Sequence, residues 1–413
     1  MIKYNKTVLS NGIRVVSERI PFTNSVCVGV WVKVGSRYEN SKNNGISHFI
    51  EHMVFKGSKN RTAFEIAKSI ESVGGSINAF TGRELTCYFA HVLSKDLPLA
   101  LEILSDITGN PLFEPSDVNN EKNVILEEIN SIDDTPEELI FEHFQKNLFY
   151  KHPLGFSVIG NSENVKRFDN TIIRDFWEKN YTSEKIFVAV SGDVEYKRLI
   201  ELIEKNFSFS RGKGKLNNSG KIHYNEQKKT IIEKNILQAH ICIGNIGVSY
   251  REREKYSLMI LTTILGGGMS SRLFQTVREK YGLAYSVYSF AEFLFDSGVF
   301  GVYAGTDKNK VERTIELIKK EFKKMCGKKI SNKEMNRVKS QLTGNLILGL
   351  ESVTSRMTRL AKMEVYLGRY FTLDEVLKDI NSVNTEDVLE MSNKILNEDD
   401  LQITILKPLS NKI

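Results

Sequence analysis

The feature that most constrains the fold is an internal duplication that extends over nearly the whole chain. The strand end Val34-Gly35-Ser36 aligns with Ile246-Gly247-Val248, 212 positions further on, and Asn170 at a predicted helix start aligns with Asn384, 214 positions further on. So constant an offset indicates tandem copies of one unit. In both copies a helix follows the aligned strand end, and a strand follows the helix that begins at the aligned Asn. We therefore expect an α+β protein with two tandem homologous α/β sandwich domains, whose antiparallel-rich sheets are covered by helices.

The domain boundaries follow from the chain length and one stretch of unusual composition. A chain of 413 residues exceeds one ordinary core and suits two domains of roughly 200 residues each. Only the stretch 208–226 is rich in Lys, Gly, Asn and Ser and lacks apolar periodicity, as linkers do. We predict an N-terminal domain over 1–210, a linker over 211–226 and a homologous C-terminal domain over 227–413.

Composition excludes several classes of partner. The net charge of +6 comes from basic and acidic residues that are interleaved, which argues against a nucleic-acid partner. No uninterrupted apolar run reaches the ~20 residues that a membrane crossing needs. The four cysteines show no C-x-x-C spacing, and the N-terminus enters a hairpin pattern without an apolar signal segment. We expect a cytoplasmic protein with no membrane partner.

The strongest chemical signal is the motif His48-x-x-Glu51-His52 on a predicted helix. At about 100° per residue, His52 lies about 40° from His48, and Glu51 about 60° to the other side. Two imidazoles one turn apart can bind one tetrahedral Zn²⁺ ion. Glu51 is poorly placed as a third ligand but can act as general base on a water molecule. The order H-x-x-E-H is the inverzincin signature.

The second copy cannot repeat this site. In the register of the duplication the three motif positions correspond to Ile260, Thr263 and Ile264. Aliphatic side chains offer no metal ligands, so this helix face is expected to pack in a core. The sequence therefore predicts one Zn²⁺ per chain, in the N-terminal, catalytic domain.

A third protein ligand is expected from a second helix around residues 115–150. Glu121 and Glu128 are seven residues apart and share a helix face within about 20°, whereas Glu127 lies about 100° from Glu128. This spacing predicts one carboxylate on the metal and one that supports a ligand, and it leaves open which is which.

These residues resemble the pitrilysin/insulinase family of inverzincin metallopeptidases. The short-chain branch, with the mitochondrial processing peptidase and its bacterial relatives, is most similar, and the likeness spans nearly the whole chain. The third ligand stands 76 residues after His52 in this pattern. The resemblance implies Glu128 as that ligand, Glu51 as the residue that activates water, and Glu121 as a supporting acid.

The resemblance also implies substrate-binding residues in both copies. It makes the strand at Asn78, Ala79 and Phe80 a sheet edge to which an extended peptide adds as a further strand. It makes Arg278 and Tyr285, in the second copy, the pair that binds the substrate backbone and stabilises the oxyanion. At the positions of Glu138 and Glu142 the processing peptidase reads a basic residue near the cut.

The function predicted is therefore a zinc metalloendopeptidase that cleaves unstructured peptides in a closed chamber, with a preference for basic residues near the cut. Long-chain relatives enclose substrate between four repeats, and this chain has two. We therefore expect a homodimer, with a related heterodimer as the other option. The rival functions are a non-catalytic scaffold or partner-activating subunit, and a zinc-binding interaction module. The complete residue set argues against the first, and Glu51 against the second.

Overall fold

The computed structural model describes residues 3–210, 212, 220, 222 and 225–409. The chain forms two compact units, and each is described by itself. Unit 1 comprises Met1–Ser131, Phe156–Gly220 and Gly349–Tyr370, and unit 2 comprises Ile132–Gly155, Lys221–Leu348 and Phe371–Ile413. Most of the predicted linker 211–226 lies outside the described residues. Among those residues, no helix has both the length and the hydrophobicity for crossing a membrane.

The sheet of unit 1 has the strand order β1-β2-β6-β3-β5-β4. Its strands are antiparallel neighbours except for the parallel pair β2 and β6. Among the described strands, β4 pairs only with β5 and is an edge of the sheet. The strands are β1 (Lys3–Val8), β2 (Arg14–Arg19), β3 (Ser25–Val32), β4 (Ser76–Thr81), β5 (Thr86–Leu93) and β6 (Ile186–Gly192).

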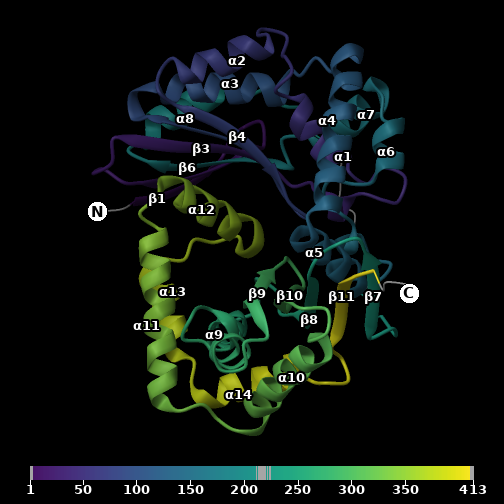
Figure 1. Cartoon of the computed structure of the whole chain (residues 1–413). Helices are drawn as coiled ribbons and strands as arrows, with labels where there is room; N and C mark the ends of the chain where they lie inside the picture. The colour runs from purple at the N-terminus through teal and green to yellow at the C-terminus, as the bar shows by residue number, and fades with distance from the viewer. Residues whose placement is uncertain (1–2, 211, 213–219, 221, 223–224, 410–413) are drawn as a thin grey trace. The chain divides into compact units, whose positions relative to one another are not determined.

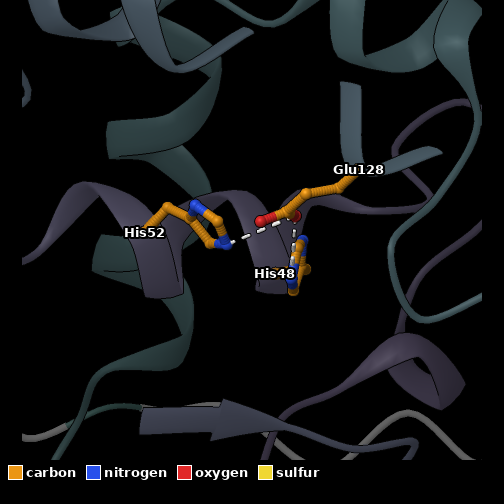
Figure 2. Close-up of side chains that lie close together, drawn as sticks. All are labelled: His48, His52 and Glu128. Carbon is orange, nitrogen blue, oxygen red and sulfur yellow. Dashed lines mark ion pairs between the residues drawn. The ribbon is translucent and has the colours of Figure 1, made fainter. Parts of the chain in front are cut away.

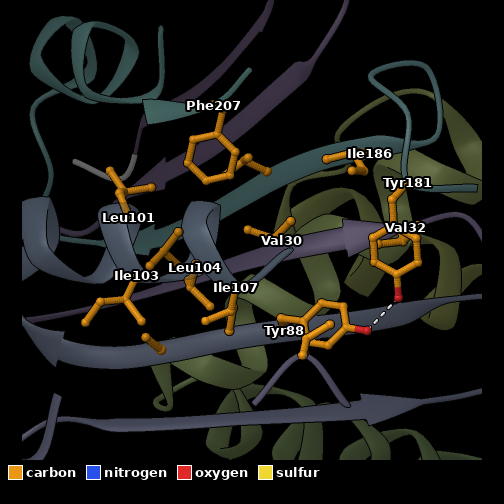
Figure 3. Packing of buried hydrophobic residues seen from close by; sticks show 14 of the residues in the cluster. Val30, Val32, Tyr88, Leu101, Ile103, Leu104, Ile107, Tyr181, Ile186 and Phe207 are labelled. Atoms are coloured by element: carbon orange, nitrogen blue, oxygen red, sulfur yellow. Dashed lines mark hydrogen bonds between the residues drawn. The ribbon is translucent and has the colours of Figure 1, made fainter. Parts of the chain in front are cut away.

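Helices cover both faces of this sheet (Figure 1). Alternate residues of β3, among them Val28, Val30 and Val32, face a core that includes Leu101 and Leu104 of α3, as Figure 3 shows in part. Within that core the Tyr88 and Tyr181 hydroxyls are hydrogen-bonded at 2.6 Å. The helices of unit 1 are η1 (Ser36–Tyr38), α1 (Ile46–Met53), α2 (Ala63–Glu71), η2 (Ser94–Asp96), α3 (Leu97–Gly109), α4 (Pro115–Asp134), α6 (Ser162–Arg167), α7 (Asn170–Asn180), α8 (Tyr196–Asn206) and α12 (Val353–Leu367).

The sheet of unit 2 repeats this topology with the strand order β7-β11-β8-β10-β9. The last strand, β11, is parallel to β7 and antiparallel to β8, just as β6 in unit 1 is parallel to β2 and antiparallel to β3. The predicted α+β class, with duplicated domains and antiparallel-rich sheets, is confirmed. The strands are β7 (Lys229–Lys234), β8 (Ala239–Gly247), β9 (Ala284–Phe293), β10 (Gly298–Thr306) and β11 (Gln402–Pro408); the helices are α5 (Pro136–Leu148), η3 (Pro153–Gly155), α9 (Lys255–Gly266), η4 (Phe274–Lys280), α10 (Val311–Gly327), α11 (Asn332–Gly349), α13 (Leu373–Ser382) and α14 (Thr385–Ile395).

The compact units differ from the continuous ranges 1–210 and 227–413, because the first half contributes α5 and the short η3 to unit 2, and the second half contributes α12 to unit 1. Helix α5 buries Ile140 and Phe144 in a cluster with residues of β8, β10 and β11. Helix α12 lies on β2, β3 and β6, where Met357 accepts a hydrogen bond from the Trp31 indole at 3.2 Å. The domain boundaries predicted from the sequence repeats remain a prediction. The compact units are a different division of the chain, because each of them consists of three separate segments.

Candidate metal centre

Helix α1 carries the motif and is fixed by its apolar face. Ile46, Phe49, Ile50 and Met53 are fully buried, and the helix packs against β4, β5 and α7. Burial of these side chains turns the rest of the helix surface, which holds the two histidines and the motif glutamate, away from the core. Both His side chains are partly exposed, at 17% and 18%. The apolar residues between the polar ones therefore set where the polar ones point.

His48, His52 and Glu128 form a cluster suited to zinc (Figure 2). One ligand atom from each lies within 4.8 Å of the others. The Glu128 Oε2 atom is 3.6 Å from His52 Nε2 and 3.9 Å from His48 Nε2. The three atoms come from α1 and α4, and two imidazoles with one carboxylate are a donor set that catalytic zinc uses. Glu127, the neighbour of Glu128, is exposed.

The protonation of His48 also fits a metal ligand. Burial lowers the pKa of this imidazole to about 3, and the neighbouring His52 acts in the same direction. The ring is therefore neutral at physiological pH, with a lone pair available for coordination. Its other nitrogen, Nδ1, is buried and has no hydrogen-bond partner in the described structure.

His52 is held by a carboxylate on the side away from the cluster. Its Nδ1 lies 2.8 Å from Glu121 Oε1, and the second oxygen of Glu121 lies 2.6 Å from Lys56 Nζ. Burial would lower the pKa of His52, but the bond to Glu121 and the charge of Glu128 outweigh burial and raise it. A carboxylate that accepts the Nδ1 proton leaves Nε2 free to face a metal. Glu121 thus has the geometry of a supporting acid.

The side chain of Glu51 contacts strand β4. Its carboxylate accepts a hydrogen bond from the Thr81 hydroxyl, at the end of β4. Burial raises the pKa of Glu51, and the bond from Thr81 acts in the opposite direction. A carboxyl with a raised pKa is better matched to accepting a proton near neutral pH.

The predicted substrate strand is an open edge. At the hairpin after β4, the Gly82 N–H donates to Leu85 O at 2.8 Å. Because antiparallel pairing alternates, Phe80 and Asn78 bond to β5, and the Ala79 backbone faces outward. Consistent with this, the Ala79 N–H donates to the side chain of Asn78 at 2.8 Å. Phe80 is 38% exposed and packs edge-on against Trp31.

The remaining predicted residues belong to unit 2. The Arg278 guanidinium lies over the Tyr285 ring at 5.1 Å, and that tyrosine is 76% exposed on the edge strand β9. Glu138 is exposed and Glu142 partly exposed on α5. The structure therefore places Arg278 in contact with Tyr285 of the neighbouring strand β9. Glu138 and Glu142 lie on the same helix, α5.

The second copy of the motif helix is apolar, as predicted. Ile260 and Ile264 on α9 are fully buried. The Thr263 hydroxyl donates to the backbone oxygen of Met259 at 2.8 Å, within its own helix. This face of α9 has no ligand to offer.

Sequence reasoning missed two residues that contact the site. Lys56 lies four residues after His52, beyond the end of α1 at Met53, so the helical period that identified the ligands does not extend to it. Thr81 comes from a strand 30 positions away from Glu51, and no local spacing signals a contact of that kind.

Comparison with known proteins gives two family matches along the chain. Residues 14–162 match the family described as insulinase (peptidase family M16), and residues 167–342 match the peptidase M16 inactive domain. The second match covers the copy whose motif helix is apolar.

Relatives and solved structures agree with these matches. A Bacillus subtilis protein named uncharacterized zinc protease YmxG is 38% identical over 401 residues, which is 97% of each chain. A Mycobacterium leprae protein named uncharacterized zinc protease ML0855 is 38% identical over 95% of this chain and 89% of its own. A protease from Helicobacter pylori has the same fold, with a TM-score of 0.91 and 24% identity over 98% of this chain and 100% of its own.

Proposed function

The chain belongs to the insulinase family of peptidases, M16, and we propose that it is a zinc-dependent endopeptidase whose ion is held by His48, His52 and Glu128. The resemblance to this family that the motif predicted is thereby confirmed, and zinc is the metal in the names of its relatives. The observation that carries the proposal is the convergence of three ligand atoms within 4.8 Å beside Glu51.

Each residue has a distinct part in the proposed reaction. Zinc in such a site supplies a Lewis acid that polarises a carbonyl group and a water molecule. Glu51 accepts a proton from the attacking water at its carboxylate and then donates it to the leaving amine. Glu121 holds the His52 ring through Nδ1. Arg278 and Tyr285 are proposed to bind the substrate backbone and the developing oxyanion.

The proposed substrate is an unstructured peptide that adds to β4 as a further strand. The outward backbone of Ala79 supports this, because an extended chain can pair with the outward N–H and C=O groups of an edge strand, where it would replace the local bond from the Ala79 N–H to the Asn78 side chain. Glu138 and Glu142 supply negative charge on α5, which suits a basic side chain near the cut. A non-catalytic scaffold would not need Glu51, the base, in addition to the three ligands.

The direct test is digestion of a mixed peptide library, analysed by mass spectrometry with and without a chelator. We expect cleavage that the chelator abolishes and that added Zn²⁺ restores. His48→Ala should abolish it, whereas the matched control His91→Ala, which removes a histidine of β5 outside the cluster, should not. Cleavage that persists in the chelator, or in His48→Ala, would refute the proposal.

A further inference from the structure

The helix that carries the motif has an unusual beginning. Helix α1 has eight residues, and its N-cap is Gly45 with φ of +98°, which has no side chain to cap the exposed N–H groups. Helices this short are marginal in isolation and depend on capping and packing. His48 is the third residue of this helix, so an error in where the helix begins would move both zinc ligands and the base.

A carboxylate from the preceding loop takes the place of the missing cap. Glu39 Oε2 accepts from the Gly45 N–H at 2.8 Å, and Oε1 accepts from the Ser47 N–H at 2.8 Å. The Asn44 side chain donates to Oε2 at 2.9 Å. Glu39 is only 4% exposed and is not part of the proposed reaction. Burial raises the pKa of Glu39, and the hydrogen bonds that its carboxylate accepts oppose that rise. The helix dipole also favours a carboxylate at the N-terminus.

The loop that presents Glu39 is itself fixed on both sides. Asn44 donates to Ser157 O at 2.8 Å, and Asn164 donates to Asn44 O at 3.1 Å. At Gly45 an added Cβ would lie 2.7 Å from Ile159 O, so only glycine fits there. The start of α1 is therefore held in one position by buried polar contacts.

A buried ion pair connects the same loop to the end of β4. Arg37, in η1 just before Glu39, bonds to Glu84 at 2.6 Å, and its N–H donates to Arg83 O at 2.8 Å. Glu84 lies in the hairpin that follows Thr81, which bonds to Glu51. The segment 36–39 thus ties the start of the motif helix to the strand that contacts its base.

We propose that Glu39 is a positioning residue of the zinc site, which sets the start of α1 and thereby the placement of His48, Glu51 and His52. This inference rests on the proposed function. Glu39 is not one of the proposed ligands, and it acts through the backbone N–H groups of Gly45 and Ser47, which lie just before the first ligand.

The test compares two glutamates that cap different helices. Glu39→Gln keeps the size of the side chain, but its NH₂ group cannot accept from an N–H, so Gly45 or Ser47 loses its acceptor. Glu65→Gln makes the same change in the capping box of α2, a helix without ligands. Zinc affinity is measured by competition with a chelator, and the ligand field from the absorption of the Co²⁺-loaded protein. Folding is checked by circular dichroism.

For Glu39→Gln we expect zinc affinity to fall about 10- to 100-fold, as for the loss of other outer partners of a metal site. We also expect an altered Co²⁺ spectrum and a lower kcat with little change in KM. Glu65→Gln should bind both ions like the parent. Parent-like zinc affinity and spectrum in Glu39→Gln, or an equal loss in both variants, would overturn the proposal.

If Glu39→Gln does not fold, Asn44→Ala decides the matter, because it keeps Glu39 and removes the side-chain donor to it, together with the bond to Ser157 O that fixes the same loop. A smaller loss of zinc affinity supports the proposal, and parent-like affinity overturns it. Failure of the proposed function is a different result: there the parent itself binds no Zn²⁺, or His48→Ala binds it as tightly as the parent.

Discussion

Two neighbouring glutamates on α4 have different surroundings. Glu128 lies beside both histidines, whereas Glu127 is exposed. We expect Glu128→Gln to weaken zinc binding by more than the roughly 10- to 100-fold that the loss of an outer partner causes. Glu127→Gln should leave it unchanged. Metal analysis after dialysis against a weak chelator distinguishes them, and loss of zinc from Glu127→Gln alone would show that the assigned ligand is wrong by one residue.

The hydroxyl of Thr81 holds the proposed base. Thr81→Val keeps the shape of the side chain and removes the donor to Glu51. We expect kcat to fall about 10-fold, less than the roughly 100-fold or greater loss expected when the base itself is removed, with zinc content unchanged. Thr81→Ser, which keeps the hydroxyl, should remain close to the parent. Equal activity of the Val and Ser variants would contradict this role.

The site residues differ in how far sequence could identify them. His48, Glu51 and His52 lie on one helix, and their spacing alone predicts a shared face. Spacing on α4 narrowed the third ligand to Glu121 or Glu128, and only the family resemblance chose between them. Thr81 and Glu39 reach α1 through tertiary contacts, so no helical period could indicate them.

At the scale of elements, the open edge of β4 makes a specific prediction. Ala79→Pro removes an N–H that faces outward, so it should leave the pairing with β5 intact. We expect KM for peptides to rise about 10-fold or more, while the melting temperature and zinc content change little. Ala79→Ser, which keeps the N–H, is the control. An unchanged KM in Ala79→Pro would argue against substrate addition at this edge.

The order of elements was predictable from sequence, but their packing partners were not. The pattern over 115–150 indicated helix, yet Pro136 lacks an N–H and separates α4 from α5. The apolar face of α5 shows that it must be buried, but not against which sheet. Ile140 and Phe144 pack in unit 2, although they lie in the first half of the sequence. Periodicity reports that a face is apolar and does not name its partner.

At the scale of the whole molecule, the proposed catalytic residues are divided between the two units. The zinc cluster, Glu51 and Glu121 belong to unit 1, and Arg278 and Tyr285 belong to unit 2. The resemblance implies that a chain with two repeats needs a partner to close a chamber. We propose a homodimer in which Tyr285 of one copy acts at the zinc site of the other.

Mixing two inactive variants tests that arrangement. His48→Ala and Tyr285→Ala should each be nearly inactive. Mixed dimers contain one site with intact ligands and an intact Tyr285, so a random mixture should regain up to about a quarter of the parental activity. Two copies of the same variant supply no such site. Two results would contradict the proposed dimer. One is a mixture that regains no activity although subunit exchange is shown to occur, and the other is sedimentation of the active protein as a monomer.

The central claim is that one zinc ion per chain supports peptide hydrolysis with Glu51 as base. Its most direct test is a Zn²⁺ titration of metal-free parent and Glu51→Gln, with bound zinc and peptide cleavage followed in the same samples. Both should bind one Zn²⁺ per chain, while kcat of the variant falls by roughly 100- to 10,000-fold. A variant that binds no zinc, or one that cleaves peptide as fast as the parent, would contradict the account.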